Sequence, residues 1–119
     1  MPKEIKFQDG ERVIHVKVKP MDQQLIRGVF DKLRRGKEGI RITDQSDAWE
    51  KSKLSDATLK AVIADVEIAE NGHEKREASS IEIDELFFGK RTNPGKFVVE
   101  AAIALAGEED REVKAVEGN

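Results

Sequence analysis

The stretch of this sequence that comes closest to a site for chemistry is Gly89–Lys96, which has the general order of a phosphate-binding loop. The nucleotide-binding pattern places four residues between its glycines and follows its lysine with Ser or Thr, whose hydroxyl holds magnesium. Here five residues separate the glycines, Phe97 follows the lysine, and Pro94 lacks an amide that could contact phosphate. The stretch therefore predicts an ordinary turn between two helices.

The remaining reactive side chains are few and scattered. His15 and His73 are the only two imidazoles, there is no Cys, and a metal site needs three or four converging ligands. The acidic clusters at 65–70 and 82–85 lack the spacing of a calcium loop. No Ser stands beside a His that could act as its base. We therefore predict that the protein is not an enzyme and needs neither a metal nor a cofactor.

Composition favours one small domain. The chain has 119 residues, of which 38% are apolar and 38% are charged, with no Tyr. A core built from so few apolar residues is small, or is completed against a partner. Residues 108–119 are mostly charged and contain only two valines. The sequence predicts a single domain over residues 1–107, followed by a flexible charged tail over residues 108–119.

Charge is distributed unevenly along the chain. The first 40 residues hold ten basic and six acidic residues, for a net charge of +4, and the remainder has a net charge of −7. Arg34, Arg35 and Lys37 fall at the end of an expected helix, where the helix dipole favours cations. A nucleic-acid contact through these residues and Arg27 is the other interpretation. No aromatic residue interleaves with the cluster, so we expect nucleic acid not to be a partner.

Hydropathy gives no sign of a membrane protein. No window approaches 18 apolar residues, and residues 1–6 are charged without a following apolar run. The lack of Cys agrees with a reducing compartment. We expect a cytoplasmic protein without a membrane segment.

Two runs of alternating residues, 3–7 and 12–19, predict an N-terminal β-hairpin. Asp9-Gly10 lies between them, and both residue types tolerate the positive φ of a tight turn. Pro20 ends the second run, because proline cannot donate to a strand ladder. The alternation assigns one set of apolar residues to the buried face: Ile5, Phe7, Ile14, Val16 and Val18.

Helical spacing begins after this hairpin. Asp22 is the expected N-cap of a helix over residues 23–35, in which Gly28 marks a close approach to another element. Residues 40–43 are a possible short edge strand. Trp49 is interpreted as a half-buried anchor, or else as an exposed interface residue. Ser55 or Asp56 is expected to cap a second helix that ends near Ala64.

The last part of the chain contains a further turn signal and two helical patterns. Asn71-Gly72 predicts a hairpin over residues 66–80, with a long helix through Glu70 as the competing interpretation. Ser80 is expected to cap a short helix over residues 81–88. Asn93 and Pro94 are expected to begin a final helix that ends at Gly107. The predicted fold is α+β: an N-terminal β-hairpin packed on three to four α-helices, with a possible second short hairpin.

The order of these elements resembles that of the tail assembly chaperones of long-tailed bacteriophages. The resemblance spans most of residues 3–107 and rests on four stretches of layout. They are the two-stranded opening IKFQDGERVIHVKVKP, the segment VEIAENGHE after a central helix, the short helix IDELFFG, and the apolar helix NPGKFVVEAAIALAG with its charged tail. Many family members carry a Gly-Trp pair before the central turn, where this chain has Ala64-Asp65.

The resemblance implies binding and not catalysis. Proteins of this family coat the helical tape-measure protein before the tail tube polymerises, and a longer frameshifted form helps to recruit tail tube subunits. It implies a cytoplasmic protein that binds such partners and that is a possible homo-oligomer. The alternative functions are a small inhibitor or adaptor that binds a host or phage protein, and a nucleic-acid-binding module. The candidate protein-binding residues are Leu86, Phe87, Phe88 and Phe97, whose other interpretation is ordinary core.

Overall fold

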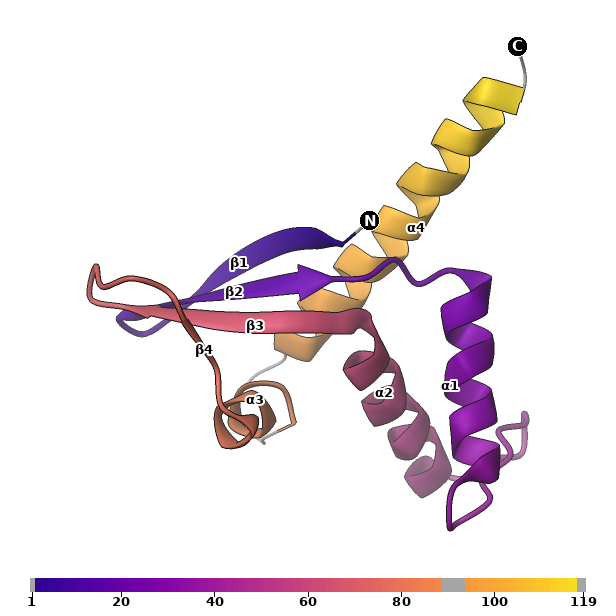
Figure 1. The fold of residues 1–119 in the computed structure, drawn as a ribbon. Coiled ribbons are helices and arrows are strands. Elements are labelled where there is room, and N and C mark those ends of the chain that lie inside the picture. The colour runs from indigo at the N-terminus through magenta and orange to yellow at the C-terminus, as the bar shows by residue number, and fades with distance from the viewer. Residues whose placement is uncertain (1, 89–93, 118–119) are drawn as a thin grey trace.

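The computed structural model describes residues 2–88 and 94–117, with side chains described as far as residue 108 (Figure 1). Four strands and four helices make an α+β fold that opens with a β-hairpin, so the predicted fold class is confirmed. The elements follow in this order: β1 (Lys3–Asp9), β2 (Arg12–Val18), α1 (Gln23–Arg35), α2 (Ala48–Val62), β3 (Ile63–Glu70), β4 (Arg76–Glu77), α3 (Ser80–Phe87) and α4 (Pro94–Glu117).

The N-terminal hairpin forms as predicted and begins a sheet of order β1-β2-β3-β4, with every neighbouring pair antiparallel. Asp9 pairs with Arg12, so Gly10 and Glu11 are the two turn residues. Gly10 has φ of 63°, whereas Asp9 keeps an ordinary φ. A glycine at the first turn position is typical of the hairpin turn that matches strand twist.

The second hairpin also forms, and the competing long helix is wrong. Asn71 and Gly72 have φ of 46° and 75°, the pair of positive angles that an Asn-Gly hairpin turn needs. The His73 N–H donates to the Glu70 carbonyl at 2.8 Å and closes the turn. The returning strand β4 has only two residues, because the segment after the turn has almost no apolar side chains to place on a sheet face.

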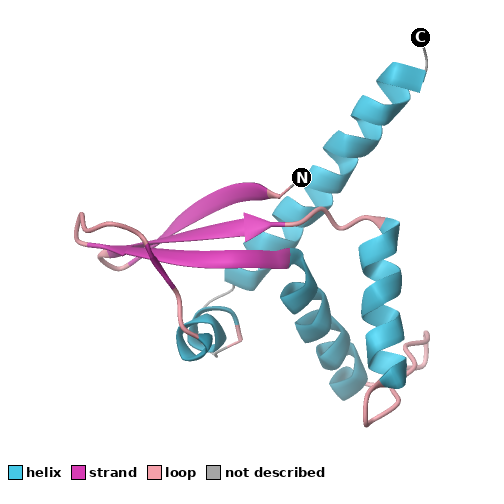
Figure 2. Cartoon of the chain, viewed as in Figure 1, coloured by secondary structure: helices cyan, strands magenta, loops and turns pink. Residues whose placement is uncertain are grey.

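The core lies between one face of the sheet and the helices. Ile14, Val16 and Ile68 are fully buried on that face. They pack with side chains from α2, α3 and α4 in one cluster. In Figure 2, α4 runs behind the strands, while α1 and α2 stand beside the sheet near the start of β3. The buried members from the helices are Leu59, Val62, Phe87, Val98 and Ala102.

The first two helices have carboxylate caps, of which the sequence predicted one. The Leu25 N–H donates to Asp22 Oδ1 at 2.8 Å, as expected for the N-cap of α1. Helix α2 begins earlier than expected, because Asp47 and Glu50 form a capping box with distances of 2.8 and 3.2 Å. The expected start at Ser55 or Asp56 is therefore wrong, and the helix ends at Val62, just before the expected end near Ala64.

Three smaller expectations fail around these helices. Residues 40–43 belong to no strand of the described sheet. Trp49 is 52% exposed in the first turn of α2, so it is not a half-buried anchor. A Cβ atom at Gly28 would meet no other atom within 4 Å, so no element approaches that glycine closely.

The last two helices fit the predicted order but not every boundary. Helix α3 is capped by Ser79, one residue before the expected cap, and Ser79 and Glu82 complete a second capping box. Helix α4 continues through Gly107 to Glu117, so the expected stop is wrong. Strong helix formers follow Gly107, and one glycine costs a helix only about 1 kcal/mol. Asn93 and most of the Gly89–Lys96 turn lie outside the described residues, and the flexible tail stays a prediction.

Within the described residues, no helix is long and apolar enough to cross a membrane.

Candidate protein-binding groove

The structure does not bring the four predicted binding residues onto one surface. Phe87 is only 7% exposed, and its ring meets Phe7 edge to face with centroids 6.1 Å apart. Leu86 and Phe88 are half-buried and pack against the same core. Phe97 alone is well exposed, at 64%. Because the short helix α3 docks on the sheet, Leu86, Phe87 and Phe88 complete the core and do not form the predicted groove.

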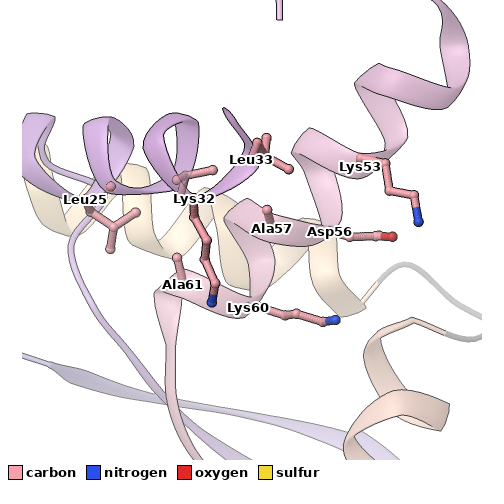
Figure 3. Close-up of a pocket in the computed structure, with 10 residues that line it drawn as sticks. Leu25, Lys32, Leu33, Lys53, Asp56, Ala57, Lys60 and Ala61 are labelled. Atoms are coloured by element: carbon pink, nitrogen blue, oxygen red, sulfur yellow. The ribbon is translucent and has the colours of Figure 1, made fainter. Parts of the chain in front are cut away.

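A groove does form elsewhere, between α1 and α2. It has a volume of about 460 Å³ and is open to solvent. Its apolar lining is contributed by both helices, as Figure 3 shows for Leu25 and Leu33 of α1 and for Ala57 and Ala61 of α2. Small residues on α2 leave room between the helices. The groove is therefore a product of the pairing of two helices that lie apart in sequence.

Lysines surround this apolar lining. Lys32 reaches from α1 toward Ala61, and Lys53 and Lys60 project from α2 (Figure 3). The only acidic residue lining the groove is Asp56. Within the described residues, none of these four side chains forms an ion pair. The groove is therefore apolar inside and positively charged at its rim.

Two of the lysines also contact aromatic rings. The Lys53 ammonium lies 5.4 Å from the centroid of the Trp49 ring, and the Lys60 ammonium lies 5.3 Å from that of Phe88. Contacts of this kind restrain a long side chain without neutralising its charge. The Lys60 contact also joins the end of α3 to α2. Both cations are thus held in place while their charge stays available to a ligand.

Gly28 lines the groove, and this position suggests why a glycine stands inside helix α1. Glycine inside a helix costs about 1 kcal/mol relative to alanine. Since a Cβ at Gly28 would meet no described atom within 4 Å, the packing of the described residues does not explain this glycine. A missing Cβ on a groove wall lets an external ligand come close to the helix backbone. The sequence shows a glycine inside a helical pattern, but it does not show what approaches that glycine.

A network of ion pairs that lies away from this groove ties α3 to the sheet. Arg76 makes two hydrogen bonds of 2.8 Å to the Glu82 carboxylate and a third, of 3.1 Å, to Glu70. The bonds from Arg76 lower the pKa of Glu82 to about 2, and the backbone N–H of Ser79 adds to this. The Glu82 and Glu70 carboxylates in turn raise the pKa of Arg76. This arrangement holds the short helix against the sheet.

The histidines are separated. His15 lies on the outer face of the sheet with its Nδ1 atom 3.3 Å from Glu4 Oε1, and His73 lies in the exposed β3–β4 turn. Lys75 is 3.5 Å from the same Glu4 oxygen and is the main reason that the pKa of Glu4 is lowered. In the part of the chain that the structure describes, no three His, Asp or Glu residues converge on a common point as metal ligands.

Comparisons with protein-family models, with curated proteins and with solved structures find no match to this chain. The groove must therefore be interpreted from its own residues.

Proposed function

We propose that the protein is a non-catalytic binding protein whose α1–α2 groove holds an amphipathic helix of a partner protein. The observation that supports this is the groove itself, which has an apolar lining and three lysines around it. None of these lysines forms an ion pair with a residue that the structure describes. Helix-in-groove recognition uses an apolar stripe for affinity and flanking charges for orientation.

The charge of the groove specifies the chemistry of the occupant. Lys32, Lys53 and Lys60 outnumber Asp56, so the favoured helix carries Asp or Glu beside its apolar stripe. The layout resemblance to tail assembly chaperones supplies a partner of this kind, the long helical tape-measure protein of a bacteriophage tail. Several copies of the chain would then bind along one tape-measure helix during tail assembly, in the cytoplasm of the host.

Co-expression with a fragment of the tape-measure protein tests the proposal. The complex is measured by size-exclusion chromatography with light scattering, and its affinity by calorimetry. Wild type should co-elute with the fragment in more than one copy. The variant Gly28→Leu should bind at least tenfold more weakly, because Gly28 lines the groove and the added side chain takes up space that the ligand needs. A Cβ at this position meets no described atom within 4 Å.

The matched control is Ala104→Leu, which adds the same side chain to an exposed position on α4, outside the groove. It should bind as wild type does, and circular dichroism should show both variants folded. Wild type that stays monomeric and ignores the fragment would exclude the tape-measure protein as partner. Equal binding by Gly28→Leu would move the binding surface away from the α1–α2 groove.

A further inference from the structure

A second groove lies on the other side of α1. Its lining from this helix is Arg27, Phe30, Asp31 and Arg34, about 180° around the axis from the residues that line the α1–α2 groove. Its volume is about 450 Å³. Residues 40–43, from the loop after the helix, form the other wall. The two grooves share no residue and are independent surfaces.

Hydrogen bonds hold the loop wall, residues 40–43, in place against α1. The Ile40 N–H donates to the Leu33 carbonyl of α1 at 3.0 Å, and the Ile40 side chain is buried. The Thr43 N–H donates to Ser46 Oγ at 2.8 Å, and the Ser46 N–H returns a bond of 3.1 Å to the Thr43 carbonyl. Ser46 is itself 8% exposed. The backbone that carries Arg41 is therefore held at a set position relative to α1.

Positive charge exceeds negative charge in this groove. Arg27, Arg34 and Arg41 are all exposed, and Asp31 is the only acidic residue in the lining. Asp31 is already engaged, since it pairs with Arg34 and lies 3.6 Å from Arg35 Nε. Neither Arg27 nor Arg41 forms an ion pair with any residue that the structure describes. Two guanidinium groups on opposite walls are thus available to an anion.

An exposed aromatic ring lies between the arginines. Phe30 is 41% exposed, and on the helix it stands three residues after Arg27 and four before Arg34. Residues at these spacings are neighbours on one face. No aromatic residue interleaves with Arg34, Arg35 and Lys37 along the chain, but the groove draws its cations from two elements and includes Phe30 in its lining. The expectation that nucleic acid is not a partner stays a prediction.

We propose that this groove binds single-stranded nucleic acid, with a base stacked on Phe30 and backbone phosphates on Arg27 and Arg41. An aromatic platform flanked by cations is the arrangement by which single strands are bound without a preferred sequence. Stacking on Phe30 requires an unstacked base, so a single strand fits the groove and a duplex does not. Guanidinium groups suit phosphate because their N–H donors match its oxygens in pairs.

Fluorescence anisotropy with a labelled oligothymidylate of about 12 nucleotides, a length within the usual range for such sites, tests this proposal. The full chain should bind this single strand more tightly than it binds a duplex of the same length. Two or three neutralised phosphates predict a slope of log K against log salt of about −1.4 to −2. Phe30→Ala should weaken binding at least fivefold, since stacking contributes about 1–3 kcal/mol per base.

Matched variants separate stacking from folding and from general charge. Ile26→Ala removes another partly exposed apolar residue of α1 outside the groove and should leave binding unchanged. Phe30→Trp should retain binding, and Arg27→Gln should make the salt slope less negative by about 0.7. Lys51→Gln on α2, which lies outside the groove, should not change the salt slope. Gly28→Leu, in the other groove, should also bind the oligonucleotide as wild type does, so this proposal can fail or stand without the proposed function.

Four results would overturn the proposal. They are the lack of measurable binding to the oligonucleotide, equal or tighter binding of the duplex, an unchanged affinity in Phe30→Ala, and equal binding of an acidic peptide of the same charge. The last result would assign the groove to an acidic protein segment.

Discussion

The sheet with α4 and the pair of helices α1 and α2 use their apolar residues in different ways. In the sheet, Ile14, Val16 and Ile68 are completely buried, and hydrogen-bonded neighbours fix their positions. In α1, Val29 is the only residue that is fully buried, while Ile26 and Phe30 are 37% and 41% exposed. The first region stabilises the fold. The second keeps apolar surface beside cations, on both sides of one helix, and this is where binding is expected.

The largest difference between the two regions should appear in core truncations. Ile68→Ala removes a side chain with no exposed surface and should lower the free energy of unfolding by about 2–5 kcal/mol. Ile26→Ala, on the exposed side of α1, should lower it by less than about 1 kcal/mol. Urea unfolding followed by circular dichroism measures both values. Equal losses would mean that α1 is as tightly packed as the sheet.

The N-terminal turn gives the next largest effect. Gly10→Val should cost about 1–2 kcal/mol or more, because φ of 63° crowds a β-branched side chain against its own backbone. Gln8→Val, in the neighbouring strand with an ordinary φ, is the control. It should cost less, because it removes only one exposed hydrogen bond, from Gln8 Nε2 to the Gly10 carbonyl at 3.0 Å. Thermal melts of the two variants make the comparison. If Gly10→Val melts at the wild-type temperature, the turn does not hold this angle in solution.

A substitution in α1 should raise the free energy of unfolding instead of lowering it. Gly28→Ala should stabilise the protein by about 1 kcal/mol, because alanine favours helix and its Cβ meets nothing within 4 Å. Gly10→Ala should instead destabilise, because its φ is positive. Urea unfolding of the two alanine variants is the measurement. A loss of stability in Gly28→Ala would show that an unrecognised contact occupies this side of α1.

The smallest effect is a pH dependence located in the sheet region. The pKa of Glu82 is lowered to about 2 from 4.5, mainly by its bonds to Arg76. The contribution of this carboxylate to the free energy of unfolding is therefore complete above about pH 5. It is lost as the pH falls toward 2, when the carboxylate is protonated in the folded protein. Arg76→Gln should therefore reduce the decline in the urea midpoint between pH 6 and pH 3. Lys51→Gln, on α2, should leave the decline unchanged.

Local signals explain why much of the fold was predictable. The turn residues Gly10 and Asn71-Gly72, the cap Asp22, and the alternation in β2 each act within a few residues of chain. Each can therefore be predicted from a few neighbouring residues. The start of α2 is equally local, because Asp47 and Glu50 have the spacing of a capping box, although Ser55 or Asp56 was the expected cap.

The candidate sites could not be predicted in the same way, because they depend on how separate elements pack. Phe87 and Phe88 were candidate binding residues with ordinary core as their other interpretation, and α3 docks so that Phe87 meets Phe7 and Phe88 meets Lys60. The α1–α2 groove requires the pairing of two helices, and the groove around Phe30 requires the fixed course of the following loop. No spacing within one segment encodes either arrangement.

The position of β1 at the edge of the sheet has a consequence for self-association. Among the described strands only β2 pairs with it, so one row of its backbone N–H and C=O groups has no strand partner among the described residues. In an antiparallel pairing of two copies of β1 centred on the strand, Lys6 would face Lys6. Like charges directly opposite each other oppose such pairing, and exposed lysines are a common guard on edge strands. Lys6, which lies outside the core, is therefore placed where its charge opposes growth into a larger sheet.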